Sequence, residues 1–413
     1  MNKNVNDSKA KAGKSMFLYR LTQTVSGFVS GCIFKRKMLR NEIKGKKGPF
    51  VVIANHQAML DFVNLIGVTK EPMTFVISES FYNAVPVKGI MSKLGLIPKQ
   101  QFQTDISDLR KMKGAIDNGE ILAIYPAGLM CEDGLSTPIP AGTYQFLKWL
   151  KADVYVARTY GTYFSSPKWS KGLRAGRTYL DVYKLFDKDE LAQMELHEVR
   201  ERTDEALLFD AYREQEKLMV KYHRGSDIRG IENVLYRCPH CGKEFGMKIR
   251  GRSVIYCEHC GFAEKSDKYG FLHKISEVGE EIRYVSDWSM KIYDSVCDAV
   301  MSGELDRMST PAEIRMINGK KKKFVTVGRA EVTLEKDNFV IEGELFGNEE
   351  RIYVPTAHFA SMPFSPGKHM EIQQEKNIYR CLPDDTRVVQ KFVNVIKARH
   401  AMSAEAQRAC KAE

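Results

Sequence analysis

The sequence of 413 residues has no run of about eighteen uninterrupted apolar residues, the length that a helix needs to cross a bilayer. It contains no internal repeat, and its hydrophobic share of 43% and charged share of 28% are ordinary for a folded chain. These features exclude a multi-span membrane protein, a collagen-like repeat and a disordered chain. The length favours roughly two to four domains of about 150 residues each.

Acidic residues are scarce at the start of the chain. The first fifty residues contain twelve Lys or Arg against Asp7 and Glu42, and so hold nearly all of the net charge of +11. This surplus favours an anionic partner, either lipid headgroups or nucleic acid. Apolar residues recur between the cations at helical spacing; they are Phe17, Leu18, Leu21, Val25, Phe28, Val29 and Cys32. The interrupted pattern argues against a signal peptide and predicts an amphipathic helix, which either packs on its own domain or lies on an anionic membrane surface.

Short apolar runs separated by helical patterns begin at residue 49. The runs expected to form buried strands are Phe50–Ala54, Thr74–Ile77, Ile121–Tyr125 and Val154–Ala157. Helical patterns lie at about 61–68, 85–94, 105–118 and 142–150, and a charged helical stretch at about 188–222. Strands that alternate with helices predict an α/β fold with a mixed, mostly parallel sheet.

The cysteines do not form an obvious disulfide framework, because nine is an odd number. Four of them form two C-x2-C pairs separated by fifteen residues: Cys238, Cys241, Cys257 and Cys260. This spacing is typical of a zinc ribbon, with rubredoxin-like iron or a pair of disulfides as the alternatives. Four thiolates leave no open coordination position, so the pattern predicts a structural zinc in a reducing compartment.

Period-2 alternation dominates the sequence beyond Lys320. The expected strands are Ala330–Lys336, Asn338–Glu344, Glu349–Pro355, His369–Gln374 and Ile378–Leu382, followed by an amphipathic helix from about Asp384 to Ala401. Several strands and one terminal helix predict a small β-sandwich or barrel closed by that helix. This order of elements resembles a PH or GRAM domain.

A histidine and an aspartate follow the first buried strand, in the segment Asn55-His56-Gln57-Ala58-Met59-Leu60-Asp61. Side chains five residues apart on one helix project about 140° from each other. His56 and Asp61 therefore meet only if His56 precedes the helix and folds back. Such a pair makes a base that can activate a hydroxyl, and the end of a buried strand opens into the usual ligand crevice of an α/β sheet. The alternative is a buried structural histidine with Asp61 as a helix cap.

Four ordered blocks over residues 50–160 resemble the glycerolipid acyltransferases of the lysophosphatidic-acid acyltransferase (PlsC-like) family. The blocks are Asn55-His56-x4-Asp61, similar to N-H-x4-D; Gly95-Leu96-Ile97-Pro98, similar to G-x-I-P; Tyr125 to Gly134, similar to F-P-E-G-T-R-S-x-D-G; and Val154–Ala157, in the place of the last apolar strand. The resemblance implies an O-acyltransferase of phospholipid biosynthesis or remodelling. It would move a fatty acyl group from acyl-CoA or acyl-carrier protein to a hydroxyl of a lysophospholipid-like acceptor.

The resemblance also implies the site residues. His56 is the catalytic base and Asp61 its catalytic partner. The substrate-binding residues that the blocks imply are Asn55, Gly95, Pro98, Lys99, Pro126 and Gly128.

The sequence departs from the family pattern where the acceptor phosphate is thought to bind. Gln101 stands in place of Arg, and Ala127, Leu129 and Met130 replace Glu, Thr and Arg. A neutral Leu-Met pair cannot bind a phosphate through charge-assisted hydrogen bonds. Either Lys99 and neighbours such as Arg158 bind it, or the acceptor is not lysophosphatidate. Two other functions remain open: a basic zinc-ribbon protein that binds nucleic acid, and a catalytically degenerate acyltransferase fold that binds lipid.

The expected organisation has four parts. They are a basic membrane-facing helical segment at 1–48, an acyltransferase domain at 49–225, a zinc ribbon at 226–268, and a β-rich PH-like domain with a C-terminal helix at 269–413. We expect a cytoplasmic protein that is peripheral on the inner face of the cell membrane. Its expected partners are a lysolipid acceptor, an acyl thioester donor and an anionic membrane surface, with no nucleic acid.

Overall fold

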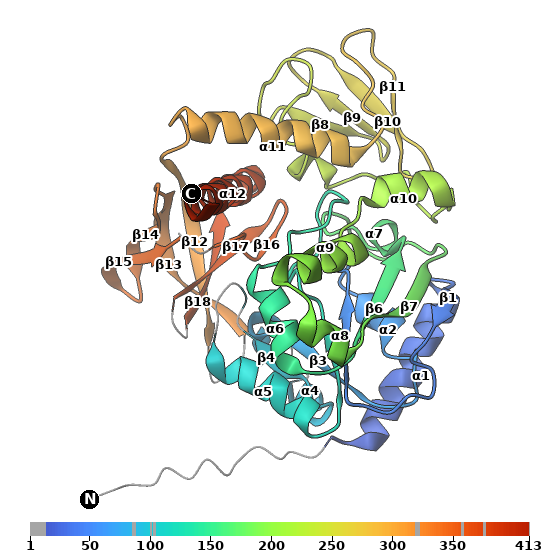
Figure 1. Cartoon of the computed structure of the whole chain (residues 1–413). Helices are drawn as coiled ribbons and strands as arrows, with labels where there is room; N and C mark the ends of the chain where they lie inside the picture. Colours follow the sequence, from blue (N-terminus) through green and yellow to red (C-terminus); the bar gives the residue numbers. More distant parts are fainter. Residues whose placement is uncertain are drawn as a thin grey trace, which may run out of the picture.

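The computed structural model describes residues 14–84, 88–99, 101, 105–318, 323–356, 359–374 and 377–412. Figure 1 shows three bodies: an α/β domain drawn in blue and green, a small sheet in yellow, and a larger β-rich body in orange and red. The helix α11 (Val285–Met301) runs from the small sheet to the β-rich body, and α12 (Val389–Ala412) lies beside it.

A seven-stranded sheet forms the centre of the α/β domain, in the order β1-β7-β6-β2-β5-β3-β4. Its strands are β1 (Lys37–Asn41), β2 (Phe50–Ala54), β3 (Met73–Ser78), β4 (Ile97–Lys99), β5 (Ile121–Ile124), β6 (Val154–Tyr160) and β7 (Tyr179–Phe186). The five strands from β6 to β4 are parallel, whereas β7 is antiparallel to β6 and parallel to β1. The predicted mixed, mostly parallel sheet is confirmed, and the four predicted strands are β2, β3, β5 and β6.

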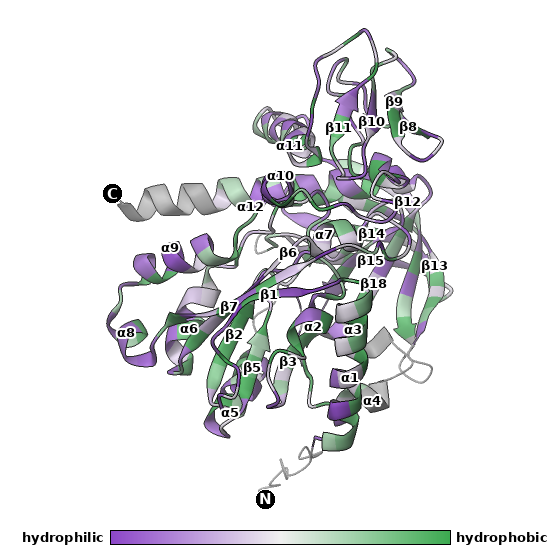
Figure 2. Cartoon of the chain, turned by 90° about the vertical axis from the view of Figure 1, so that its right-hand side faces the viewer, coloured by the Kyte–Doolittle hydropathy of each residue, from purple (hydrophilic) through white to green (hydrophobic). Residues whose placement is uncertain are grey.

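Helices cover both faces of this sheet. They are α1 (Met16–Cys32), α2 (Asp61–Leu65), α3 (Glu79–Ala84), α4 (Lys88–Lys93), α5 (Ile106–Asp117), α6 (Gly142–Leu150), α7 (Thr162–Ser165), α8 (Lys188–Gln193), α9 (Leu196–Leu207) and α10 (Ala211–Leu218). Neighbouring residues of a central strand point to opposite faces. In β2, Val51 and Ile53 join the core with α5, α6 and α9, whereas Phe50 and Val52 join the core with α1 and α2. Figure 2 shows β2 and β5 as apolar strands inside these layers, which is why their sequence reads as continuous apolar runs.

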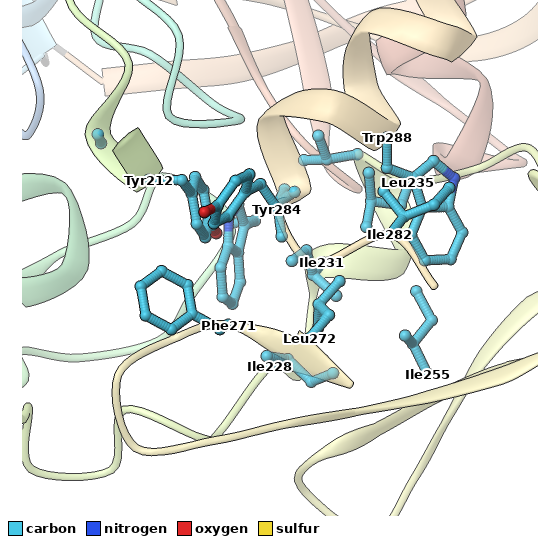
Figure 3. Close-up of a cluster of buried hydrophobic side chains, with 14 of the residues drawn as sticks. Tyr212, Ile228, Ile231, Leu235, Ile255, Phe271, Leu272, Ile282, Tyr284 and Trp288 are labelled. Carbon is cyan, nitrogen blue, oxygen red and sulfur yellow. The ribbon is translucent and has the colours of Figure 1, made fainter. Parts of the chain in front are cut away.

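The small sheet contains the cysteine pairs and shares its core with the α/β domain. Its antiparallel strands are β8 (Met247–Arg250), β9 (Val254–Cys257), β10 (Ala263–Ser266) and β11 (Leu272–Lys274), with a short 3-10 turn, η1 (Ile231–Asn233), before them. Figure 3 shows side chains of this core, in which Tyr212 of α10 lies beside Tyr284 and Trp288 of α11 lies at the other side of the same cluster. The same cluster includes Tyr163 of α7. The small sheet is therefore packed continuously onto the α/β domain.

A second seven-stranded sheet forms the β-rich body, in the order β15-β14-β13-β12-β18-β17-β16. Its strands are β12 (Met308–Asn318), β13 (Lys323–Leu334), β14 (Asn338–Leu345), β15 (Asn348–Pro355), β16 (Phe364–Ser365), β17 (His369–Gln374) and β18 (Asn377–Pro383), followed by η2 (Thr386–Val388) and α12. All pairs are antiparallel, and Phe392 and Ile396 of α12 enter the core. The predicted β-rich region with a terminal helix is confirmed. β12, the central strand, and the short β16 were not predicted from the sequence.

Candidate active site and metal-binding cluster

The first and third sequence blocks, and Lys99 directly after the second, lie at one edge of the α/β sheet. His56 follows β2, Pro126 follows β5 and Lys99 ends β4. These three strands are parallel, so their carboxyl ends lie at the same edge, where ligands bind in open α/β sheets.

His56 and Asp61 form a hydrogen-bonded pair at this edge. His56 lies in the loop before α2, and Asp61 is the first residue of that helix, as the contact between them requires. The His56 Nδ1 to Asp61 Oδ2 distance is 2.9 Å. The same oxygen accepts hydrogen bonds from the backbone N–H groups of Gln57, at 2.7 Å, and Ala58, at 2.9 Å.

These contacts determine which imidazole nitrogen can act as a base. Asp61 is fully buried and accepts two backbone hydrogen bonds, so it is the acceptor for Nδ1–H of His56. The Nε2 lone pair of His56 is then available to take a proton. The side chain of His56 is 20% exposed, which leaves it open to a substrate.

Asn55 and Gln57 hold the histidine loop against β6 and α7. The Asn55 amide donates to Thr159 O at 2.8 Å and accepts from Thr159 N at 2.8 Å. The Gln57 side chain accepts from Thr162 Oγ1 and Tyr163 N. Both amides are buried. The structure thus gives Asn55 a positioning contact, and its predicted contact with substrate stays a prediction.

Two side chains of the third block lie close to the histidine pair. The ring centroids of Tyr125 and His56 are 4.6 Å apart. Cys131 is fully buried, with Sγ 3.5 Å from Gln57 O. Burial raises the pKa of the Cys131 thiol well above its usual value, and the nearby acidic side chains raise it further. Cys131 is therefore a neutral thiol, unsuited to act as a nucleophile.

The second and third blocks also contact each other. Gln101 Nε2 donates to Gly128 O at 2.5 Å. Gly128 has a φ of +68° and closes a turn in which its N–H donates to Tyr125 O. Gly95 has a φ of +74° in the turn before β4, which contains Pro98. Gly128 therefore lies in a loop at the carboxyl edge, whereas Gly95 precedes β4 and lies at the opposite edge, against the side chain of Lys14.

The two cations suggested for a phosphate differ in their surroundings. Arg158 donates to the carbonyls of Glu205, Ala206 and Leu208 and pairs with Glu214 at 2.9 Å, so its guanidinium is occupied by protein groups. Burial lowers the pKa of Lys99, and the negative charges of Asp108 and Asp105 partly offset this effect. Both cations therefore have acidic groups of the protein near them.

A narrow pocket of about 10 Å³, partly open to solvent and roomy enough for about one water-sized group, lies beside His56. Its walls come from the β2 end, the loop after β5 and the segment between α9 and α10; the lining residues are Ala54, Asn55, His56, Ala127, Ser136, Thr137, Ile139, Leu207, Leu208 and Phe209. Most of these side chains are apolar, and the pocket has room for no more than a small group next to the base.

The helix α1 presents an apolar stripe to solvent. Phe17 is 81% and Phe28 69% exposed, and Leu21 and Val25 between them are also exposed. The opposite face packs on the domain through polar and small side chains, with Gln23 donating to the carbonyls of Ile66 and Thr69. Among the described residues, no helix combines enough length with enough apolar character to cross a membrane.

The four cysteines of the two C-x2-C pairs converge in the small sheet. Their sulfur atoms all lie within 4.8 Å of one another, and the Cys238–Cys260 and Cys241–Cys257 sulfurs are 3.7 Å apart. A disulfide requires about 2.05 Å. Tetrahedral ligands at the Zn–S distance of about 2.3 Å are about 3.8 Å apart. The arrangement therefore fits a four-thiolate metal site and excludes the pair of disulfides.

The two cysteine turns have the same backbone geometry. Gly242 and Gly261 have φ values of +71° and +77°, and each donates its N–H to the carbonyl of the first cysteine of its pair. Only glycine adopts this conformation without strain. The repeated turns point the thiols at a common centre, which is what a metal ion needs.

Several residues at the site were missed by sequence reasoning. Glu132 and Asp133 of the third block are bonded to residues of α12 and α11, more than 150 positions away. Thr159 holds Asn55 from β6. No local pattern marks such long-range partners, although two adjacent acids in an otherwise apolar loop were a signal that cations lie near.

The comparisons with known proteins support the acyltransferase assignment at the family level. Residues 33–163 match the family model described as Acyltransferase. This range contains the histidine pair and all four blocks in full, and the resemblance read from the motifs is confirmed. No curated protein matches the chain significantly.

Two solved structures resemble parts of the chain. One is the 1-acyl-sn-glycerophosphate (LPA) acyltransferase PlsC from Thermotoga maritima, with 17% identity, a TM-score of 0.41, and coverage of 48% of this chain and 79% of that chain. The other is the Ran binding domain of the nuclear complex component Nup2 from Ashbya gossypii, with 15% identity, a TM-score of 0.19, and coverage of 24% of this chain and 98% of that chain. At these TM-scores neither likeness carries an argument about function.

Proposed function

We propose that this chain, whose residues 33–163 form an acyltransferase domain, moves a fatty acyl group from a thioester to a hydroxyl of a lysophospholipid-like acceptor. The donor is acyl-CoA or acyl-carrier protein. The observation that carries the proposal is the His56–Asp61 pair at the carboxyl edge of the sheet, with Nδ1 held at 2.9 Å and Nε2 open to substrate.

The proposed reaction needs one base and no covalent enzyme intermediate. His56 Nε2 takes the proton of the acceptor hydroxyl, and the hydroxyl oxygen attacks the thioester carbonyl. The new C–O bond forms, the C–S bond breaks, and the proton on His56 passes to the departing thiolate. Asp61 keeps the imidazole oriented and stabilises its positive charge. The neutral, buried thiol of Cys131 is consistent with direct transfer.

A thiol-release assay tests this proposal. The purified protein is mixed with acyl-CoA, or with acyl-carrier protein, and a panel of lysolipids, and the free thiol is measured together with the acylated product. We expect thiol release that depends on the lysolipid. A protein that releases no thiol with either donor, and binds nucleic acid or lipid instead, would contradict the proposal.

We propose further that lysophosphatidate is not strongly preferred. Met130 and Gln101 are neutral, and Arg158 is occupied by Glu214 and three carbonyls. The double substitution Gln101→Arg with Met130→Arg should shift kcat/KM toward phosphate monoesters by about tenfold or more, since each charge-assisted hydrogen bond is worth about 1.5–3 kcal/mol. Leu129 is buried and is left unchanged.

The matched control for acceptor preference is the neutral pair Gln101→Met with Met130→Leu. It changes the same positions without adding charge, so the preference among headgroups should stay that of the wild type. A wild-type protein that already selects lysophosphatidate strongly would contradict the prediction and assign the phosphate to Lys99.

A membrane location on the inner face of the cell membrane is also proposed. The exposed apolar stripe of α1 lies on the same domain as His56, and Met59 and Phe62, near the histidine, are exposed as well. Such a stripe can enter the headgroup region while nearby cations contact anionic lipid. The site would then face its lipid acceptor.

Vesicle sedimentation tests the membrane proposal. Changing Phe17, Leu21, Val25 and Phe28 to Ser should abolish most binding to anionic vesicles, whereas Met301→Ser, at an exposed residue of α11, should not. Wild-type binding should fall with salt, because charges are screened beyond about 8–10 Å. Substitution is preferable to deleting α1, since Tyr19 is buried and its hydroxyl accepts from Met73 N. Unchanged binding by the quadruple variant would place the anchor elsewhere.

Two further assignments complete the proposal. The four-cysteine cluster holds structural zinc, which its sulfur spacing fits. The β-rich body is PH-like, supported by two antiparallel meanders joined through β12 and β18 and closed by α12. We assign it no catalytic group.

A further inference from the structure

The loop between β5 and α6 (residues 125–141) is fastened to the C-terminal part of the chain by two acidic side chains. Glu132 Oε1 accepts from Lys397 Nζ of α12 at 2.5 Å. Asp133 Oδ2 accepts from Ser289 Oγ of α11 at 2.6 Å. Gln390 of α12 adds a longer hydrogen bond to Glu132, at 3.4 Å. Two helices that are distant in the sequence, α11 and α12, thus hold the middle of this loop.

The Glu132–Lys397 pair lies away from water. Glu132 is 3% exposed, and the Lys397 side chain is 19% exposed. Burial alone would raise the pKa of Glu132, but the charges of Lys397 and Lys168 outweigh it and lower that pKa. Burial likewise opposes the charge on Lys397, and Glu132 and Asp133 raise its pKa in spite of it. Both groups are therefore charged, and each needs the other.

Lys168 supports the pair without replacing Lys397. Its Nζ is buried, makes no hydrogen bond within the described part of the chain, and lies 3.5 Å from the ring centroid of Phe364. Burial lowers the pKa of Lys168 to about 8, which Glu132 partly offsets. Lys397 is thus the cation that donates directly to Glu132.

The same loop forms part of the candidate active site. Tyr125 at its start packs on the His56 ring at 4.6 Å, and Cys131, next to Glu132, contacts Gln57 O at 3.5 Å. Ala127 and Ser136 line the pocket beside His56. A shift of Glu132 would therefore move both a neighbour of the base and a wall of the pocket.

We propose that Lys397 is a positioning residue, which latches the β5–α6 loop in the conformation that the active site needs. The C-terminal helix thereby makes the geometry around His56 depend on the docking of the β-rich body. This inference rests on the function proposed above only for its kinetic consequence. The latch itself is a property of the fold and has a readout that requires no substrate.

Cys131 reports on the latch. It is fully buried in the loop, so a maleimide should label it slowly in the wild type. Lys397→Met removes the only cation that donates a hydrogen bond to Glu132 among the described residues and leaves this buried charge with the longer-range effect of Lys168 alone, which destabilises the loop. The loop should open locally, and labelling of Cys131, measured by peptide mass spectrometry, should accelerate about tenfold or more. Cys381, fully buried in β18, should label at the wild-type rate.

Lys391→Met is the matched control. Lys391 is on the same helix, pairs with Glu244 at 2.7 Å and has an 18% exposed side chain, close to that of Lys397. This change removes an ion pair of α12 without touching the β5–α6 loop, so labelling of Cys131 should not change. Ser289→Ala, which removes only the hydroxyl bonded to Asp133, should accelerate labelling in the same direction by a smaller factor, and it decides the question if Lys397→Met does not fold.

The kinetic arm applies the same variants to thiol release. Lys397→Met should lower kcat by about tenfold or more and should raise the acceptor KM by a smaller factor. The reason is that misplacing a catalytic neighbour by about 1 Å can cost a factor of 10² in rate. The latch is overturned if Cys131 stays protected in both Lys397→Met and Ser289→Ala, if Lys391→Met exposes it equally, or if Cys131 and Cys381 become exposed together. Wild-type protein without turnover would refute the function and leave the labelling result standing.

Discussion

His56→Ala should reduce acyl transfer by a factor of about 10²–10⁴, the range expected when a positioned general base is removed. The imidazole lies at the carboxyl edge of the sheet, with Nδ1 held by Asp61 and Nε2 open. No other histidine of the described chain pairs with a carboxylate in this loop. The measurement is the rate of thiol release at saturating donor, with lysolipid varied.

Asp61→Asn should lower the rate in the same direction. Asp61 Oδ2 accepts from His56, Gln57 and Ala58, so an amide at this position weakens the orientation of the imidazole and its stabilisation when protonated. The effect on folding must be measured beside the rate, because the side chain is fully buried. Thermal unfolding of each variant provides that control.

The chain offers a second histidine–aspartate pair as a matched control for the first. His273 Nε2 lies 3.0 Å from Asp267 Oδ2 in the small sheet, and its side chain is 43% exposed. His273→Ala removes an equivalent contact outside the candidate site, so thiol release should stay at the wild-type rate. Near-normal turnover by His56→Ala, or an equal loss in His273→Ala, would show that the base has been wrongly assigned.

The histidine pair was predictable because its geometry is local. His56 and Asp61 are five residues apart, and the start of α2 at Asp61 places one residue before the helix and one in its first turn. The cysteine turns were predictable for the same reason, since each pair and its following glycine form one short turn. The sequence predicts that the four cysteines share one site. It does not predict the sulfur spacing of 3.7 Å, which depends on how the two turns face each other.

In the α/β sheet, the strands that the sequence revealed are those with the strongest burial, whereas the partly exposed β1, β4 and β7 were not predicted. β2 and β5 lie inside the sheet with both faces covered, so nearly every residue is apolar. β12 was missed because Pro311 interrupts it, and a proline normally demotes a strand. The structure accommodates Pro311 just beyond the end of the pairing with β18, which begins at Ala312.

The tie between the β5–α6 loop and the C-terminal helix could not be predicted from one sequence. Glu132 and Lys397 are 265 residues apart. In the sequence, Glu132 is part of the third block and Lys397 is one of the polar residues of an amphipathic helix, so neither position indicates the other as its partner. Helical periodicity marks only which side chains of α12 are apolar. The Glu132–Lys397 pair is buried only because the α/β domain and the β-rich body pack against each other.

Removal of the metal should produce the other large effect, the unfolding of the small sheet. Structural zinc in small cysteine sites contributes about 10–16 kcal/mol of apparent binding free energy at pH 7. The short strands β8 to β11 enclose little core of their own, and two of the four ligands, Cys238 and Cys257, are buried within it. We expect one zinc per chain in reduced protein, with Zn–S distances of about 2.3 Å by X-ray absorption.

Chelation followed by hydrogen exchange shows how far the unfolding spreads. The core of the small sheet continues through Trp288 of α11 and Tyr212 of α10 to Tyr163 of α7, so exchange should accelerate in these helices as well as in the sheet. β2 and β5, which lie in separate cores, should stay protected. Activity should fall with the loss of α11, because Ser289 on this helix holds Asp133 of the β5–α6 loop.

Cys257→Ser should reproduce the effect of chelation, whereas Cys32→Ser, at an exposed cysteine outside the cluster, should retain the metal and its exchange pattern. Serine is a poor ligand for zinc, so a single substitution among four thiolates is enough to weaken the site strongly. Reduced protein without bound zinc, or exchange in the small sheet that is unchanged by chelation, would contradict the structural assignment. Faster exchange confined to β8–β11 would keep the metal assignment and refute only the predicted spread into α10 and α11, since it would mean that the aromatic core survives without the sheet.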